Sequence, residues 1–186
     1  MIIVRNDDFD PRWSLDIVKK FHEFFMERNM VETLSIQMAR GYTIGFKEDV
    51  VNYIKNTPNY DLALHGWEHE RYENVLCKDI VRDLAASLYF FKRIFDVTPE
   101  YFYSPWNIQN VEVLKACQIL GLKVRENPVD IKAYINRPEV REKADSVYFH
   151  MWEKDHDILV PKLLDIIKEE QNGPVQPPKT KNDIVL

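Results

Sequence analysis

Short runs of apolar residues alternate along this chain with longer stretches in which apolar positions recur every three or four residues. The short runs predict buried strands, and the longer stretches predict amphipathic helices. Such an alternation is typical of strand–helix units repeated around a parallel sheet, here with about six to seven strands. We therefore expect an α/β fold whose strands lie at residues 2–5, 33–38, 61–64, 101–103, 122–125 and 146–149.

Two helices have clear signals in the first half of the chain. Ser14 is placed to cap the first of them, because its hydroxyl can accept a hydrogen bond from the first turn. The apolar face of this helix is Val18, Phe21 and Phe25. The second helix is expected over residues 78–95, with an apolar face formed by Ile80, Leu84, Leu88 and Phe91. Both faces are suited to cover a sheet.

The second half of the chain shows two further helices and a change of composition near its end. One helix is expected over residues 111–120, followed by Gly121 as a stop signal. The other covers residues 158–170 and has Pro161 in its first turn, where proline is tolerated. Gly173, Pro174, Pro177 and Pro178 follow. We expect a single domain of strand–helix units at residues 1–171 and an extended arm at 172–186.

The composition is that of a packed globular protein. A chain of 186 residues can bury roughly 70% of the surface that it exposes when unfolded. The net charge is -5, and no stripe of Lys and Arg with interleaved aromatics recurs, so we expect no nucleic-acid partner. Cys77 and Cys117 are far apart and predict reduced thiols. The chain opens on a short apolar run that meets Arg5 at once, so we expect a cytoplasmic protein without a leader or a membrane span.

The residues with chemical potential follow the ends of the expected strands. Asp7 and Asp8 follow the first strand, His65 ends the third, Ser104 follows the fourth, and His150 follows the last. The carboxyl ends of parallel strands meet at one face of such a fold, where catalytic groups gather. We therefore expect these residues to form one site.

This set of side chains suits a hydrolytic metal centre. Two imidazoles, from His65 and His69, and one carboxylate, from Asp8, can hold a borderline metal such as Zn²⁺ and leave positions open for water and substrate. Asp7 could then accept a proton from the activated water. His150 could protonate the departing group from the opposite side.

Each of these features also has a simpler interpretation. An Asp-Asp pair at a strand end is often a solvated turn or a helix start, and His150 alone could be a buried core histidine. His22 lies in an ordinary amphipathic helix and His156 in a charged loop. We expect both of these histidines to be surface or capping residues. The joint placement of the other residues favours the functional interpretation.

Four segments together resemble the ordered motifs of the NodB-type polysaccharide deacetylases, carbohydrate esterase family four. They are Val4-Arg5-Asn6-Asp7-Asp8-Phe9, Leu62-Ala63-Leu64-His65-Gly66-Trp67-Glu68-His69, Phe102-Tyr103-Ser104-Pro105-Trp106-Asn107 and Tyr148-Phe149-His150. The resemblance implies a distorted (β/α) barrel that removes N- or O-acetyl groups from sugars with a bound divalent metal. By motif, Asp7 resembles the catalytic base and His150 the catalytic acid. The metal ligands would be Asp8, His65 and His69.

The chain departs from the family at two motifs. Tyr103 stands where the third motif usually has an arginine that orients the base. Arg5 or Arg125, each at the end of an expected strand, could reach the same carboxylate instead. The acidic residue of the fourth motif, which normally tunes the catalytic histidine, has no recognisable counterpart, and Asp130 is a poor candidate.

Aromatic residues beside the motifs suggest a sugar-binding surface, since a pyranose stacks on aromatic rings. We expect substrate contacts from Trp67, Ser104, Trp106 and Trp152. The expected activity is removal of an acetyl group from an acetylated sugar or oligosaccharide. Hydrolysis of another amide-type C–N bond and a sugar-binding pseudoenzyme are the alternatives.

Overall fold

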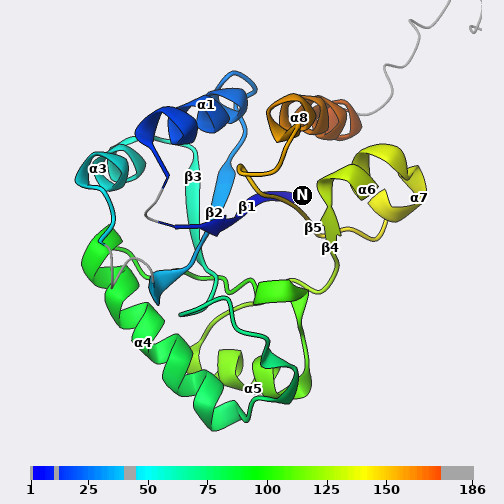
Figure 1. Cartoon of the computed structure of the whole chain (residues 1–186). Helices are drawn as coiled ribbons and strands as arrows, with labels where there is room; N and C mark the ends of the chain where they lie inside the picture. The colour runs from blue at the N-terminus through cyan, green and yellow to red at the C-terminus, as the bar shows by residue number, and fades with distance from the viewer. Residues whose placement is uncertain (1, 11–12, 40–44, 173–186) are drawn as a thin grey trace, which may run out of the picture.

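Five parallel strands form one sheet in the computed structural model, in the order β3-β2-β1-β5-β4 (Figure 1). The structure describes residues 2–10, 13–39 and 45–172. The strands are β1 (Ile3–Phe9), β2 (Glu32–Ile36), β3 (Tyr60–Leu64), β4 (Pro128–Asp130) and β5 (Ser146–Phe149). β1 lies at the centre of the sheet and pairs with β2 and β5. The chain therefore has the expected parallel α/β fold.

The sheet continues beyond β3 through two isolated bridges. Leu64 pairs with Phe102, and Tyr101 pairs with Lys123, both in parallel. These bridges lie where strands were expected at residues 101–103 and 122–125, but they are too short to count as strands. β4 was not expected, because three residues that include Pro128 give little strand signal. The described residues thus hold five strands rather than the expected six to seven.

Helices surround the sheet on its outer side (Figure 1). α1 is capped by Ser14, whose side chain accepts a hydrogen bond from the backbone N–H of Ile17. α5 ends at Gly121, which has φ +71. The helices are α1 (Leu15–Met26), α3 (Glu48–Asn56), α4 (Cys77–Phe95), α5 (Val111–Leu120), α6 (Ile131–Asn136), α7 (Pro138–Arg141) and α8 (His156–Asn172), with short 3-10 turns η1 (Tyr72–Asn74) and η2 (Pro105–Asn107). α3, α6 and α7 were not expected.

α8 begins two residues earlier than expected. It starts at His156, so Pro161 lies inside the helix rather than in its first turn. The arm expected at residues 172–186 lies outside the described residues except for Asn172, which ends α8. Among the described residues, no helix has the length and the apolar composition needed to span a membrane.

The two faces of the sheet differ in polarity. Phe149 of β5 faces outward and packs on Phe21 and Phe25 of α1, with ring centroids 5.8 and 6.2 Å apart. Arg5 and Tyr148 pair in register and face inward, because neighbouring residues in register point to the same side. Arg5 is fully buried in this interior. The inner face of the sheet is therefore polar beneath the strand ends, and the apolar core lies on the outer face under the helices.

His22 and His156 are not surface residues, contrary to expectation. Both are 0% exposed. His22 Nδ1 lies 3.2 Å from a carboxylate oxygen of Glu32, and His22 Nε2 lies 3.0 Å from the carbonyl oxygen of Pro58. A buried imidazole requires such partners, and those of His22 are distant in sequence, which explains why a local pattern did not reveal its burial.

Candidate metal centre

Asp8 is placed by an irregular turn of the backbone near the end of β1. The register between β1 and β2 shifts between Asn6 and Phe9, and Asp8 has φ 60. This left-handed conformation is uncommon for residues other than glycine, although aspartate tolerates it better than most. The carboxylates of Asp7 and Asp8 consequently make different contacts.

The two histidines come from a tight loop after β3. The backbone N–H of His65 donates to the carbonyl of Ile36, which anchors the start of the loop to β2. Gly66 has φ +83, and a Cβ atom there would lie 3.0 Å from the hydroxyl oxygen of Tyr72. Glycine is therefore strongly favoured at this position, both for the backbone conformation and for the close approach. The turn brings His69 back beside His65.

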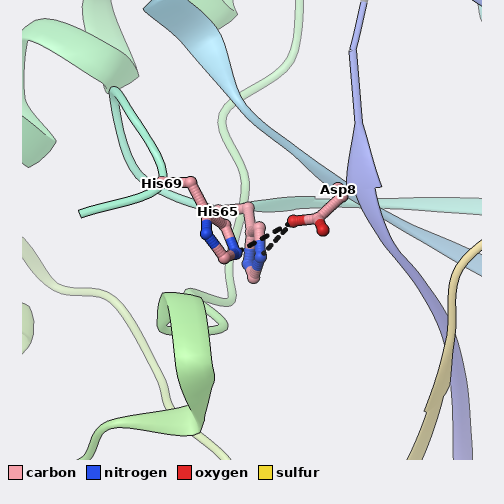
Figure 2. Close-up of side chains that lie close together, drawn as sticks. All are labelled: Asp8, His65 and His69. Carbon is pink, nitrogen blue, oxygen red and sulfur yellow. Dashed lines mark ion pairs between the residues drawn. The ribbon is translucent and has the colours of Figure 1, made fainter. Parts of the chain in front are cut away.

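Asp8, His65 and His69 converge on one point (Figure 2). The Nε2 atoms of His65 and His69 lie 3.2 and 3.1 Å from Oδ1 of Asp8. One ligand atom from each residue lies within 4.8 Å of the other two. Two imidazole nitrogens and one carboxylate oxygen form a donor set that suits Zn²⁺ and related ions.

Neighbouring groups orient these donors. His65 Nδ1 lies 2.6 Å from the carbonyl oxygen of Tyr103, and since a carbonyl only accepts, this nitrogen holds the proton. With Nδ1 engaged in this way, Nε2 is the ring nitrogen that faces Asp8, as in metal-binding histidines. Gln37 donates a 2.7 Å hydrogen bond to Oδ1 of Asp8.

The charge of Asp8 fits a cation site. Burial alone would raise the pKa of its carboxyl group, but hydrogen bonds and charge interactions with His65 and His69 bring that pKa well below its usual range. The carboxylate is consequently ionised at neutral pH. An ionised oxygen beside two imidazole nitrogens is what a divalent cation requires.

Asp7 lies beside the centre and is held by Arg5. Asp7 Oδ2 is 3.4 Å from Arg5 Nη2, and both side chains are buried. The guanidinium group of Arg5 lies over the rings of Tyr103 and Tyr148, 4.4 and 5.2 Å from their centroids. Arg5 also donates to Asn107 Oδ1. Of the two arginines suggested by the sequence, Arg5 therefore reaches the Asp7 carboxylate.

Arg125 makes different contacts. Its Nη2 lies 3.5 Å from the hydroxyl of Tyr101, and its guanidinium group lies over the ring of that residue. Within the described part of the chain, no ion pair joins Arg125 to Asp7, so its expected supporting role is not supported by the geometry. Tyr103, which stands where the family's arginine was expected, instead stacks on Arg5.

His150 lies on the other side of Asp8. Its Nε2 is 3.6 Å from Asp8 Oδ2, and its Nδ1 is 2.6 Å from Glu153 Oε1. The ring of Trp152 stacks on the imidazole at 5.0 Å and an interplanar angle of 27°. Glu153 was not identified from the sequence. The only local signal was its position three residues after His150, which in an irregular loop does not predict contact.

A cavity of about 320 Å³ joins these residues. It adjoins a second cavity of about 600 Å³ beside the start of α1. Asp8, His69 and Trp152 line both of them. The first cavity is lined by Asp7, Asp8, His65, His69, Trp106, Asn107, Tyr148, His150 and Trp152.

Two of the four residues expected to contact substrate lie elsewhere. Trp67 packs against Phe90, with ring centroids 5.4 Å apart, and Ser104 is buried with its hydroxyl 3.4 Å from the Pro105 carbonyl oxygen. Neither is among the described residues that line the two cavities. Trp106 and Trp152 do line the first cavity, and each is 55% exposed.

The chain was compared with known families and structures. No family model matches it, and no curated protein matches it. Solved structures do resemble it at low sequence identity. Peptidoglycan deacetylase PdaC from Bacillus subtilis is 13% identical, with a TM-score of 0.65 over 91% of this chain and 84% of that one. A family 4 acetyl xylan esterase from Clostridium thermocellum in complex with a cobalt ion is 15% identical, with a TM-score of 0.62 over 89% and 80%.

A third similar structure is a pseudoenzyme. This carbohydrate esterase family 4 protein from Bacillus anthracis is 13% identical, with a TM-score of 0.69 over 91% of this chain and 61% of that one. Together the three structures show that the chain has the fold of the family 4 carbohydrate esterases. Identities this low establish the fold only, and the activity has to be argued from the site.

Proposed function

We propose that this chain is a divergent member of carbohydrate esterase family four. In this proposal it is a metal-dependent hydrolase that removes an acetyl group from an N- or O-acetylated sugar. The observation that supports it best is the convergence of Asp8, His65 and His69, with Asp7 beside them and His150 opposite. The similarity to the solved peptidoglycan deacetylase and acetyl xylan esterase agrees with this assignment.

Asp8, His65 and His69 would hold a divalent cation, and Zn²⁺ suits this donor set best. When bound, the cation would polarise the acyl carbonyl and lower the pKa of a water molecule. The supporting contacts from Tyr103 and Gln37 keep the donor atoms aimed at one point without rearrangement.

Asp7 would accept the proton of the attacking water. Its Oδ1 is buried and has no hydrogen-bond partner among the described residues, whereas Oδ2 is paired with Arg5. One oxygen is thus held in place and the other is left without a partner, and Asp7 is among the residues that line the cavity. A positioned carboxylate of this kind contributes by general base catalysis.

His150 would protonate the departing nitrogen or oxygen of the sugar. Its Nδ1 is engaged by Glu153, so its Nε2 faces Asp8 and the cavity. Base and acid then lie on different sides of the acyl carbon, which separates proton removal from proton delivery.

Trp106 and Trp152 would bind the sugar. Trp106 lies beside His69, with ring centroids 5.0 Å apart, and Trp152 stacks on His150. Both remain about half exposed at the rim of the cavity. Two exposed aromatic rings on either side of the centre can stack on the apolar faces of pyranose rings.

The test combines metal content with acetate release from N- and O-acetylated oligosaccharides. Purified protein should contain about one equivalent of divalent metal. His65→Ala should lose both metal and activity, because it removes a ligand. His150→Ala is the matched control: it should keep the metal and lose activity by about 10²-fold or more.

Two outcomes would contradict the proposal. Unchanged acetate release by His65→Ala would show that this centre does not perform the reaction. Metal binding without acetate release from any substrate would favour the two alternative functions, a hydrolase of another C–N bond or a sugar-binding pseudoenzyme. These two differ in the molecules that they bind or convert. A panel of amides and cyclic amides identifies another C–N hydrolase, whereas retained sugar binding without turnover identifies a pseudoenzyme.

A further inference from the structure

The loop that follows β5 forms a closed unit around His150. The backbone N–H of Glu153 donates to the carbonyl of His150 at 3.1 Å. Nδ1 of the fully buried His156 lies 2.7 Å from the same carbonyl oxygen. The main chain of His150 is therefore held from two later positions in the same loop.

Glu153 occupies the middle of this unit. Its Oε1 lies 2.6 Å from Nδ1 of His150, and its Oε2 lies 3.4 Å from Nε2 of His156. Lys132 of α6 donates to the same Oε2 at 3.2 Å. Burial alone would raise the pKa of Glu153, but the hydrogen bonds from His150 and Lys132 lower it overall. Glu153 is thus an ionised acceptor held by hydrogen bonds from His150 and Lys132.

We propose that Glu153 is a positioning residue for His150, taking the place of the acidic group that could not be found in the sequence. Its carboxylate accepts a hydrogen bond from Nδ1–H and directs Nε2 toward Asp8, while the Trp152 ring packs on one face of the imidazole. This inference rests on the proposed deacetylase activity. It assigns a role to a loop residue that none of the recognised motifs contains.

Positioning of His150 affects the step in which the leaving group departs. Water adds its oxygen to the acyl carbon and gives one proton to Asp7. The bond from that carbon to the sugar nitrogen then breaks, and the nitrogen leaves with a proton from Nε2 of His150. The products are acetate and the free amine. An imidazole that can turn about its side-chain bonds would deliver that proton poorly, so Glu153 should matter only where the leaving group needs protonation.

The experiment compares two substrates with different leaving groups. An N-acetylglucosamine oligomer releases an amine, which requires a proton, and 4-nitrophenyl acetate releases a stable phenolate, which does not. For Glu153→Ala, kcat on the oligomer should fall by about 10–100-fold with KM nearly unchanged. The kcat on the aryl ester should stay within about two-fold. Glu153→Gln should recover part of the loss, because its amide oxygen can still accept from Nδ1.

Asp155→Asn is the matched control. It removes a negative charge from an exposed position of the same loop, and asparagine tolerates the positive φ of 69 found there. Both kcat values should match those of the original protein. Equal losses on both substrates in Glu153→Ala, or no loss on either, would overturn the assignment.

A crystal structure of Glu153→Ala gives a readout that does not depend on activity. The His150 ring should leave its place beside Asp8, and an unchanged ring would overturn the positioning role. Failure of the unmodified protein to release acetate from either substrate would instead contradict the proposed function. The two failures are therefore distinguishable.

Discussion

Substitution of Arg5 tests whether a strand residue supports the candidate base. Arg5→Met removes the guanidinium group and keeps a flexible apolar side chain of similar length in the barrel. The change breaks the 3.4 Å ion pair with Asp7 and the stacking contacts with Tyr103 and Tyr148. It leaves the Asp7 carboxylate buried without its cation.

The size of the effect follows from these contacts. At 3.4 Å and an effective dielectric constant of about 20, the attraction of the pair is about 5 kcal/mol before desolvation is counted. Measured losses on removing one partner of a buried pair are about 3–5 kcal/mol, and we expect the free energy of unfolding to fall by this amount. A shift of the carboxylate by about 1 Å would lower kcat by about 10²-fold.

The assay is urea unfolding together with acetate-release kinetics. Arg125→Met is the control, because Arg125 contacts Tyr101 and its removal leaves the Arg5–Asp7 pair intact. We expect it to retain activity and to lose about 1 kcal/mol of stability. Equal effects of the two substitutions, or activity of Arg5→Met within about two-fold of the original, would refute the argument from the ion pair.

Three other substitutions test single contacts. Gly66→Ala should lower the free energy of unfolding by about 1–2 kcal/mol, because alanine is strained in the left-handed conformation. It should also weaken metal binding, because its Cβ would meet the Tyr72 hydroxyl. Gly121→Ala is the control: its Cβ would lie in open space, so urea unfolding should show the backbone cost alone. Gln37→Leu removes the hydrogen bond to Asp8, and calorimetric titration with Zn²⁺ should show affinity about 10-fold or more weaker, whereas equal affinity would contradict the contact. Burial raises the pKa of the Cys117 thiol to about 12, whereas the pKa of a thiol in the unfolded chain is about 8.5. The contribution of this thiol to the free energy of unfolding is therefore fully present below about pH 8.5. Above that pH it falls by about 1.4 kcal/mol per pH unit, up to about pH 12. When the free energy of unfolding in urea is plotted against pH, Cys117→Ala should lack this decline above about pH 8.5. The same decline in the variant and the original protein would contradict the explanation.

The parts of the fold that the sequence predicted depend on local patterns. The Ser14 cap and the Gly121 stop are signals within one turn of a helix, and both are present in the structure. The strand ends that hold Asp8 and His65 follow apolar runs that alternate with helices, and the parallel pairing brings their carboxyl ends together. Local information was therefore enough to anticipate which residues meet at one face.

The contacts that tune the site depend on residues that meet only after folding. Arg5 and Asp7 are two residues apart on β1 and could have been paired from strand alternation, since both face the interior. The rings that hold Arg5 come from Tyr103 and Tyr148, far along the chain, and no local pattern reveals them. Glu153 reaches His150 through an irregular loop, where spacing has no fixed meaning.

The tryptophans beside the motifs also could not be assigned to the cavity or to the core from local sequence. Trp67 and Trp106 both lie next to motif residues, yet Trp67 packs on Phe90 of α4, whereas Trp106 lines the cavity. Trp106 reaches this position through a backbone φ of 60, a conformation that a residue of this size rarely adopts. Proximity in sequence to a motif therefore did not predict which ring lines the cavity.

The central claim is that Asp8, His65 and His69 hold a divalent cation. A crystal structure of the protein grown with Zn²⁺, with anomalous scattering measured at the zinc edge, tests it most directly. We expect one strong anomalous peak about 2.0–2.2 Å from Nε2 of both histidines and a carboxylate oxygen of Asp8. A map without a peak at these three side chains, at saturating zinc, would contradict the account.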